Sequence, residues 1–582
     1  MLMKKSLAAR LTPALLVCAI FSNAFALDLR RAQQTPQRDR KVNAPAPTAT
    51  PQTTPAPQAT PTPQTTPTPT PAPTPLLPAP RTVAELSARI AQVLSQPALA
   101  PALFGIKVVS LDTGRVLFAE NAAKLLVPAS NMKLYTVAAA LDRLGPDFRF
   151  TTSVYARERP DAKGHVRGDL IIYGRGDPTF ATRFNDGDYF KAIDDLAARI
   201  VAAGVKRIEG DIVGDESYFT GPPRSPGWEW DDLQWYYGAD ISALTVNDNA
   251  FDLFIKPGVR AGDAAGVTTG PANPIIRIVV SRHNEEVASA PNFLTFVNRV
   301  KTAPRGTKRD LTVHRPLGQN VVEVGGQIAE DDPGYTGSVA VAQPALLFTA
   351  MLRAALEKQG VSCKGRTRIT NAPVRPQLDE EVEAGQPVKI PYSIEIASRQ
   401  SPPLSEIAAQ TLKPSQNLYT ELILRTLGKQ FPSPDPKATT AEAGITVVRK
   451  FLGEAGVETG HLALVDGSGL ARQNLITAEA TVQLLTYMSR HRHAQVYRDA
   501  QPLAGVDGTL RNRLKGTIAA GNMRAKTGTL NNVSGLSGYV TSAAGERLVF
   551  SMLVNHYPDD MPPRQNYLDA VAVLLASFAG KS

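Results

Sequence analysis

The pattern of hydrophobic and polar positions changes twice along the chain after about residue 82. Residues 82–148 mix helical and strand-like spacing, and residues 395–582 do the same. In the first stretch this predicts helices 83–94 and 130–144, with strands 104–111 and 115–119 joined by an Asp-Thr-Gly turn between them. In the second stretch it predicts helices 403–412, 417–427, 439–455 and 477–490, strands 523–530, 536–542 and 547–555, and a last helix 559–578.

The middle of the chain, about 149–394, has a different pattern. Short strand-like pieces such as 168–173 and 210–213 are separated by glycine turns, and one clear helix is expected over 344–359. An aromatic, proline-rich loop follows the second of these strands, over residues 222–237. Its three tryptophans favour packing beneath the loop, with stacking on a sugar as the alternative.

The first 81 residues lack any globular pattern. A basic start, an apolar run and a small-x-small site are typical of a secretory signal peptide over residues 1–26, cut after Ala26; an uncleaved anchor is the alternative. Residues 27–81 are predicted to be a Pro/Thr-rich disordered linker. Within them, residues 45–80 hold 14 prolines, 11 threonines and no charge, so they cannot bury a core. This linker is either a spacer for the folded part or a passive leader.

Composition excludes some classes of protein and leaves others open. Lys and Arg number 63 against 53 Asp and Glu, and the net charge of +10 favours envelope polymers, lipid headgroups or nucleic acid without choosing among them. Only two cysteines are present, Cys18 and Cys363, so a disulfide scaffold and a multi-cysteine metal site are excluded. The seven histidines show no metal-binding spacing.

Three short motifs in the outer regions carry nucleophile chemistry. Ser130 and Lys133 form Ser-x-x-Lys, and on a helix positions three apart share a face, so the amine can reach the hydroxyl. A serine hydroxyl is a poor nucleophile without a base, and a lysine is a base only where burial or another cation lowers its pKa. Ser415 and Asn417 form Ser-x-Asn, for which a helix cap is the alternative, and a Lys-Thr-Gly lies in the strand-like run at 526–528.

The combination is more specific than its members. Ser-x-x-Lys, Ser-x-Asn and Lys-Thr-Gly in this order resemble the motif set of class A β-lactamases and penicillin-binding proteins. The long interval between Ser130 and Ser415 narrows the resemblance to class C low-molecular-mass penicillin-binding proteins, the D-alanyl-D-alanine carboxypeptidase/endopeptidase family. The stretches that match this family are 128–133, 174–178, 401–407, 412–419, 466–470 and 526–529. Gln416 departs from the aspartate that is usual there.

The resemblance implies an α+β fold and a domain organisation. A penicillin-binding, serine β-lactamase-like domain, with an antiparallel sheet flanked by helices, would be built from residues 82–148 and 395–582. β-Rich domains at 149–394 would be inserted between its two halves. We therefore expect the cores of the two halves to meet in one sheet.

The resemblance also implies an activity. It predicts a periplasmic serine DD-peptidase that hydrolyses D-alanyl-D-alanine or D-alanyl-diaminopimelate bonds of peptidoglycan, with no cofactor and no metal. The expected partners are peptidoglycan stem peptides and, as covalent inhibitors, β-lactam antibiotics. Nucleic acid is not expected to bind, and no integral membrane span is expected once the signal peptide is removed.

The family's chemistry assigns roles to five residues. Ser130 would attack the carbonyl between two D-alanines, and Lys133 would accept its proton. Ser415 would relay a proton to the leaving amine. Asn417 would hydrogen-bond the substrate amide and help hold Lys133, and Lys526 would attract the terminal carboxylate and lower the pKa of Lys133 by like-charge repulsion.

Substrate-binding residues are also implied by the resemblance. Thr527, Gly528 and Thr529 would lie along the terminal carboxylate, and the backbone N–H groups of residues 130 and 529 would form the oxyanion hole. Asp215 would bind the ammonium of diaminopimelate and Arg472 its carboxylate. For these two, a turn aspartate and a surface arginine are the alternatives.

Two other functions remain open from the sequence. A serine β-lactamase of the same fold would need a group for fast deacylation, and no Glu-x-x-Leu-Asn occurs between Ser415 and Lys526. A non-catalytic peptidoglycan-binding scaffold would suit the linker and the basic charge. The complete set of motif residues favours an enzyme over this scaffold.

Overall fold

One antiparallel sheet joins the beginning and the end of the folded chain. The computed structural model describes residues 78–270, 276–280, 293–370, 394–557 and 565–582. The five strands have the order β18-β19-β20-β1-β2, with bounds β1 Leu103–Ser110, β2 Val116–Glu120, β18 Arg524–Leu530, β19 Val533–Thr541 and β20 Arg547–Asn555. β1 pairs with β20 over its whole length, from Leu103 opposite Asn555 to Ser110 opposite Leu548. The predicted strands of the two outer regions therefore form one sheet.

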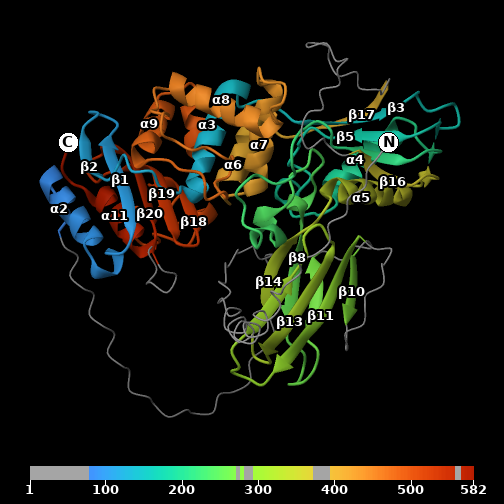
Figure 1. Ribbon diagram of the computed structural model, residues 1–582, viewed down its shortest axis with the longest axis horizontal. Coiled ribbons are helices and arrows are strands. Elements are labelled where there is room, and N and C mark those ends of the chain that lie inside the picture. Colours follow the sequence, from blue (N-terminus) through green and yellow to red (C-terminus); the bar gives the residue numbers. More distant parts are fainter. Residues whose placement is uncertain (1–77, 271–275, 281–292, 371–393, 558–564) are drawn as a thin grey trace, which may run out of the picture. The chain divides into compact units, whose positions relative to one another are not determined.

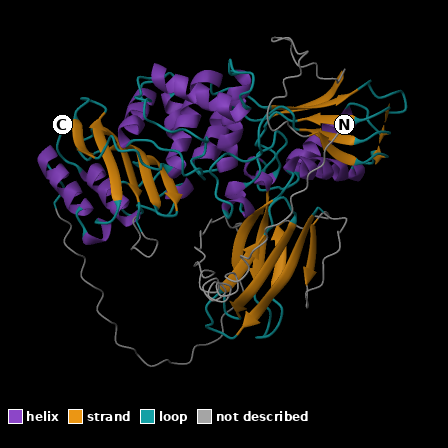
Figure 2. Ribbon diagram, in the orientation of Figure 1, coloured by secondary structure: helices purple, strands orange, loops and turns teal. Residues whose placement is uncertain are grey.

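Helices cover both faces of this sheet (Figures 1 and 2). The alternation of side chains along β20 shows why: Phe550 and Met552 pack into one core with α2 and α11, whereas Val549 and Leu553 pack into another with the remaining helices. The helices of the two layers are α2 Val83–Leu94, α3 Met132–Leu144, α6 Leu404–Leu412, α7 Asn417–Gln430, α8 Thr440–Glu454, α9 Ala478–Met488, α10 Ala494–Asp499 and α11 Gln565–Ser577. This is the expected α+β arrangement, although the short helix α10 was not anticipated.

The middle of the chain forms four further sheets. Their strand orders are β10-β11-β13-β12, β14-β8-β9, β15-β6-β4 and β16-β7-β5-β3-β17. Their strands are β3 Thr151–Ala156, β4 His165–Val166, β5 Leu170–Tyr173, β6 Arg207–Ile208, β7 Ile212–Asp215, β8 Ala250–Lys256, β9 Gly266–Gly270, β10 Ile276–Val280, β11 Leu294–Ala303, β12 Asp310–His314, β13 Val321–Ala329, β14 Tyr335–Ala340, β15 Ser362–Cys363, β16 Thr367–Thr370 and β17 Ile394–Gln400.

Among the described residues of this region, two α-helices accompany the strands, one of them predicted. The expected helix is α5, Pro344–Lys358, and the second is α4, Lys191–Ala202. The helix expected at 344–359 is therefore confirmed, whereas α4 was not predicted. The signal was present, because Ile193, Leu196 and Ile200 have helical spacing and all are buried in the same core as α5.

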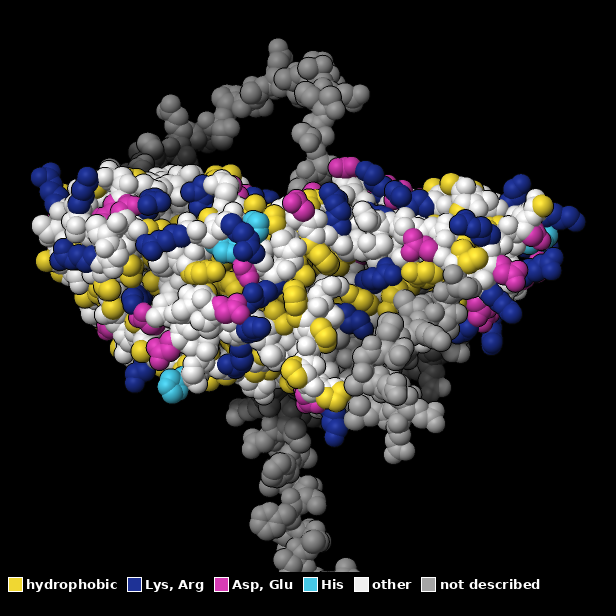
Figure 3. Space-filling view, turned by 90° about the horizontal axis from the view of Figure 1, so that it is seen from above, with side chains coloured by type: hydrophobic (Ala, Val, Ile, Leu, Met, Phe, Trp, Pro, Cys, Tyr) yellow, Lys and Arg dark blue, Asp and Glu magenta, His cyan; other side chains and the backbone are white. Residues whose placement is uncertain are grey.

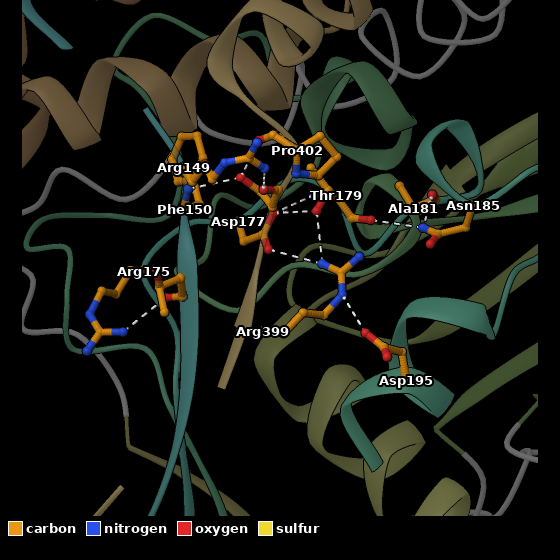
Figure 4. Close-up of polar contacts among 12 residues, drawn as sticks. Arg149, Phe150, Arg175, Asp177, Thr179, Ala181, Asn185, Asp195, Arg399 and Pro402 are labelled. Atoms are coloured by element: carbon orange, nitrogen blue, oxygen red, sulfur yellow. Dashed lines mark hydrogen bonds and ion pairs between the residues drawn. The ribbon is translucent and has the colours of Figure 1, made fainter. Parts of the chain in front are cut away.

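A buried polar cluster ties the two ends of this middle region together (Figure 4). β3 and β17, which begin and end the region, pair antiparallel. Arg399 of β17 contacts Asp177 at 3.3 Å and Asp195 at 3.4 Å, and its guanidinium lies 4.5 Å from the centre of the Phe180 ring. Burial raises the pKa of Asp177, and the charge of Arg399 opposes that shift. The Gly-Arg-Gly-Asp-Pro stretch at 174–178 is thereby fixed to the returning strand.

The structure leaves several of the sequence-based predictions untested. The signal peptide and linker residues 27–77 lie outside the described residues, and the domain boundaries at 148 and 394 stay predictions. In the described ranges, no helix has the length and apolar character needed to cross a bilayer, and no cluster of His, Cys, Asp and Glu suits a metal ion.

Figure 3 shows Lys and Arg side chains spread over the visible face, with Asp and Glu among them.

Candidate active site

Ser130 lies in a strained turn immediately before helix α3. The turn Ala129–Asn131 is a single 3-10 turn, so the α-helix begins at Met132 and not at Ser130 as predicted. Ala129 has a φ of 46°, a left-handed conformation that costs a non-glycine residue free energy. The turn leaves Ser130 partly exposed while Lys133 is completely buried, and Lys133 Nζ lies 2.9 Å from Ser130 Oγ.

The Lys133 amine has two further partners. Its Nζ lies 2.6 Å from Asn417 Oδ1 and 2.7 Å from the backbone carbonyl oxygen of Ser468. Both oxygens can only accept hydrogen bonds, whereas the hydroxyl of Ser130 can also donate one. A neutral amine has two N–H groups and one lone pair. With the N–H groups directed at the two carbonyl oxygens, the lone pair faces the Ser130 hydroxyl, which is the geometry for proton transfer to Lys133.

Ser415 and Asn417 stand at the start of helix α7. The N-cap is Gln416, whose side chain accepts from Leu418 N at 3.1 Å, so the cap alternative applies to the middle residue of the motif and not to Ser415. Ser415 has a φ of 66°, a second left-handed residue beside the same amines. The amide of Asn417 donates from Nδ2 to the backbone carbonyl of Tyr237 at 2.8 Å, which turns its Oδ1 toward Lys133.

The Lys-Thr-Gly motif lies on the edge strand β18. Lys526 is completely buried, and its Nζ donates to Ser415 Oγ at 2.9 Å and to the Thr527 carbonyl at 2.8 Å. Burial, and then the charge of Lys133, lower the pKa of Lys526 well below its ordinary value. The expected effect of Lys526 on the pKa of Lys133 stays a prediction. Thr527 Oγ1 lies 2.7 Å from Thr509 Oγ1.

Gly528 allows β18 to lie against the turn that holds Ser130. A Cβ at this position would lie 2.6 Å from Asn131 Nδ2 and 2.7 Å from the Pro128 carbonyl. Any larger side chain would have to push strand and turn apart. The glycine of the motif thus has a packing function, while Thr529 next to it is partly exposed.

Two of the predicted substrate-binding residues, Asp215 and Arg472, make contacts of their own. Asp215 is in β7, almost fully buried, and its carboxylate accepts from Ser217 N at 2.8 Å. Arg472 pairs with Glu229 at 2.7 Å and donates to the Asn531 carbonyl at 3.0 Å, just beyond β18. Arg472 also lines a cavity of about 360 Å³. The roles of both residues in substrate binding stay predictions.

Sequence reasoning missed two kinds of group that hold Lys133 or its partners. The carbonyls of Ser468 and Tyr237 act through the main chain, and a backbone oxygen leaves no signal in residue identity. Glu421 and Trp228 are the second kind: Glu421 is buried and accepts from Ser468 N at 2.8 Å, and Trp228 Nε1 donates to Asp466 at 2.9 Å. Glu421 follows Asn417 by one helical turn, a spacing that could have drawn attention to it.

Comparisons with known proteins identify relatives of this chain. The chain is 35% identical to the D-alanyl-D-alanine carboxypeptidase of Actinomadura sp. (strain R39), over 86% of both chains. It is 25% identical to D-alanyl-D-alanine carboxypeptidase DacB of Haemophilus influenzae, over 78% of this chain and 85% of that protein. The crystal structure of penicillin binding protein 4 from H. influenzae has the same fold, with a TM-score of 0.67 at 24% identity over 83% of this chain and 97% of that one.

A family assignment follows from the extent of the match. The D-Ala-D-Ala carboxypeptidase 3 (S13) family matches residues 86–577, nearly the whole of the folded chain. This range contains all three motifs and the five sheets described above. The chain therefore belongs to the D-Ala-D-Ala carboxypeptidase 3 (S13) family, as the order and spacing of its motifs predicted.

Proposed function

We propose that this protein is a serine DD-peptidase that hydrolyses D-alanyl-D-alanine or D-alanyl-diaminopimelate bonds of peptidoglycan through an acyl-enzyme on Ser130. The observation that carries the proposal is the environment of Lys133, whose Nζ is held 2.9 Å from Ser130 Oγ by two carbonyl oxygens. A general base must lie within hydrogen-bond reach of the proton it removes, and this amine does.

The acylation step assigns a movement of atoms to each group. Ser130 Oγ forms a bond to the carbonyl carbon of the penultimate D-alanine, and its proton passes to Lys133 Nζ. The C–N bond then breaks, and the proton held by Lys133 passes through Ser415 to the leaving amine, so that Lys133 is neutral again; Ser415 Oγ lies 2.9 Å from Lys526 Nζ. Lys526 supplies positive potential for the terminal carboxylate. The N–H groups of residues 130 and 529 would stabilise the developing oxyanion.

Deacylation uses the same groups in the opposite direction. Water attacks the acyl carbon and gives a proton to Lys133, and Lys133 returns that proton to Ser130 Oγ as the C–O bond of the acyl-enzyme breaks. The same nucleophile would attack the strained amide of a β-lactam, so penicillins are expected to label Ser130. Support for this class of ligand comes from the H. influenzae protein, which has been crystallised with a β-lactam and shares 22% identity with this chain at a TM-score of 0.61.

The proposed location follows from the substrate. Peptidoglycan stem peptides lie outside the inner membrane, and residues 1–26 have the pattern of a secretory signal peptide. We therefore place the working enzyme in the periplasm. The Actinomadura relative carries the name D-alanyl-D-alanine carboxypeptidase, which supports the same bond as substrate.

Two assays test this proposal. Fluorescent penicillin should label the wild type and a Ser95→Ala control, which changes an exposed serine, but not Ser130→Ala. Mass spectrometry of purified muropeptides should show loss of a terminal D-alanine or cleavage of cross-links by the wild type and Ser95→Ala, but not by Ser130→Ala. Folded wild type that gains no label, or that releases no D-alanine and opens no cross-link, would contradict the proposal. Sustained turnover of nitrocefin beyond one equivalent would instead indicate a β-lactamase.

A further inference from the structure

A backbone carbonyl helps to aim the Lys133 amine, and its own orientation must be fixed. The carbonyl of Ser468 and the N–H of Gly469 belong to one peptide unit. The carbonyl lies 2.7 Å from Lys133 Nζ, and the N–H donates to Asp466 Oδ1 at 2.7 Å. A rotation of this peptide plane would move the carbonyl oxygen away from the amine.

A second carboxylate holds the two peptide units before it. Glu421 Oε1 accepts from Gly467 N at 3.0 Å and from Ser468 N at 2.8 Å. Asp466 also accepts from Ala471 N at 2.8 Å. Two carboxylates thus bind four of the five N–H groups from Gly467 to Ala471, and the turn between them has little freedom to rotate.

The two carboxylates are deeply buried, which is costly. Glu421 and Asp466 are both 0% exposed. Their other donors include the side chains of Ser225, to Glu421 at 3.3 Å, and Trp228, to Asp466 at 2.9 Å. Replacing buried charged groups by well-packed apolar ones is often neutral or stabilising, so stability alone does not account for such a pair.

Helix α7 links the two acceptors of the Lys133 amine. Asn417 and Glu421 are one turn apart on the same face. Asn417 accepts from Lys133 directly, at 2.6 Å, whereas Glu421 accepts from Ser468 N and so holds the peptide unit that precedes the one carrying the Ser468 carbonyl. A single rigid element thereby sets the directions of both N–H groups of the amine, and with them the direction of its lone pair.

We propose that Glu421 is a positioning residue for the Lys133 base: it fixes the turn 466–471 so that the Ser468 carbonyl accepts one N–H of the amine and leaves the lone pair facing Ser130. This inference rests on the proposed acyl-enzyme chemistry. It assigns Glu421 no proton transfer and no contact with the substrate. Its loss should slow the chemical step and leave the binding of ligand unchanged.

The test separates those two steps in stopped-flow acylation by a fluorescent penicillin. Glu421→Gln keeps an oxygen that can accept from both N–H groups, but a neutral acceptor forms hydrogen bonds about half as strong as a charged one. We expect its acylation rate constant to fall about 5-fold, and that of Glu421→Ala about 100-fold, with the dissociation constant of the initial complex unchanged in each. Thr426→Val is the matched control. It lies buried on the same helix, and its Oγ1 has no hydrogen-bond partner in the described chain, so no change is expected.

The outcomes distinguish this inference from the proposed function. If the wild type is acylated and both Glu421 variants keep its acylation rate constant within twofold, the positioning role is wrong and the DD-peptidase proposal stands. If the wild type is not acylated, the proposed function itself fails. A loss confined to the dissociation constant would overturn the positioning role in favour of ligand contact. If Glu421→Ala does not fold, Glu421→Gln alone decides, because a rate constant equal to wild type in that variant overturns the inference.

Discussion

Lys133 and Lys526 are chemically identical side chains placed in two different surroundings. Both are fully buried, and each lies 2.9 Å from the hydroxyl of a partly exposed serine. Lys133 has two carbonyl oxygens from other segments of the chain beside its amine, whereas Lys526 has the carbonyl of its own neighbour, Thr527. The Lys133 amine is therefore aimed by its surroundings, and the Lys526 amine is mainly a source of positive potential.

The repulsion between the two amines connects their roles. Two cations in one buried site are unfavourable, and burial already lowers the pKa of Lys526 before the charge of Lys133 is counted. Such a pair of amines is stable only if at most one of them is protonated. Proton transfer from Ser130 to Lys133 thus occurs beside a group that can itself lose its charge. The comparison predicts that the two lysines differ in how strongly they accelerate acylation.

Replacement of Lys133 should have the largest effect on the rate of acylation. In Lys133→Ala, Ser130 keeps its position but loses its base, and general-base catalysis is typically worth 10²–10⁴-fold. We expect the acylation rate constant to fall about 10³-fold, measured with a fluorescent penicillin. Lys515→Ala, which changes an exposed lysine, should act like wild type. A loss below about 10-fold for Lys133→Ala would remove the distinction between the two lysines.

Glu421 should make the free energy of unfolding depend on pH. Burial, and then the charge of Asp466, raise the pKa of Glu421 from 4.5 to about 7. Between these values the native protein binds more protons than the unfolded chain, so its stability falls as the pH rises. Relative to Glu421→Gln, the wild type should lose roughly 3 kcal/mol of unfolding free energy between about pH 4.5 and 7. Urea denaturation across this range measures it, and a constant difference between the two proteins would contradict the shift.

Lys526 should give the opposite slope and a smaller loss of rate. Its pKa is lowered, so the unfolded chain binds the additional proton, and wild-type stability should rise with pH toward the ordinary lysine range. Lys526→Met keeps the volume and should lack this rise. We expect its acylation by penicillin to fall about 10²-fold, the size typical of one lost electrostatic stabiliser. A fall as large as that of Lys133→Ala would show that both amines serve the same step.

The smallest effect should come from Gly528, where strand β18, which carries Lys526, packs against the turn that precedes Lys133. Gly528→Ala places a methyl group against Asn131 and the Pro128 carbonyl, and overpacking of this kind costs about 1–3 kcal/mol. Gly453→Ala in helix α8 is the matched control, because its methyl group would meet nothing within 4 Å. Thermal unfolding should show a lower midpoint for the first variant and an equal or higher one for the second. Equal midpoints for Gly528→Ala and wild type would mean that β18 and the Ser130 turn can separate freely.

The sequence predicted the outer regions far better than the middle. Helix Val83–Leu94 and the hairpin after it have strong periodicity and clear turn residues, and they form as expected. The helix at Ser130 begins later than predicted because its first turn is tightened and strained at Ala129. Helix α4 was missed although its spacing was readable, because the surrounding short strands dominated the interpretation of that region.

In the candidate site, side chains could be predicted from the sequence but backbone groups could not. Residue types and spacing pointed to Ser130, Lys133, Ser415, Asn417 and Lys526, and the structure places these side chains in contact as two linked groups. The Ser468 and Tyr237 carbonyls were beyond sequence reasoning, since any residue type supplies a carbonyl and only the path of the backbone decides where it points. Arg472 and Asp215 show the converse, because the family resemblance implied roles for them that the local contacts neither require nor exclude.

The contact between Asn417 and Tyr237 has a consequence for rebuilding this protein from parts. The acceptor is a main-chain oxygen of the middle region, so every amino acid at position 237 would offer it as long as the backbone keeps its course. Alanine scanning would pass over the contact, and relatives are free to vary the side chain there. Excision of residues 149–394 would remove it, and the Asn417 amide could then rotate away from Lys133. A shortened protein would therefore keep all three motifs but lose the contact that turns Asn417 Oδ1 toward the Lys133 amine.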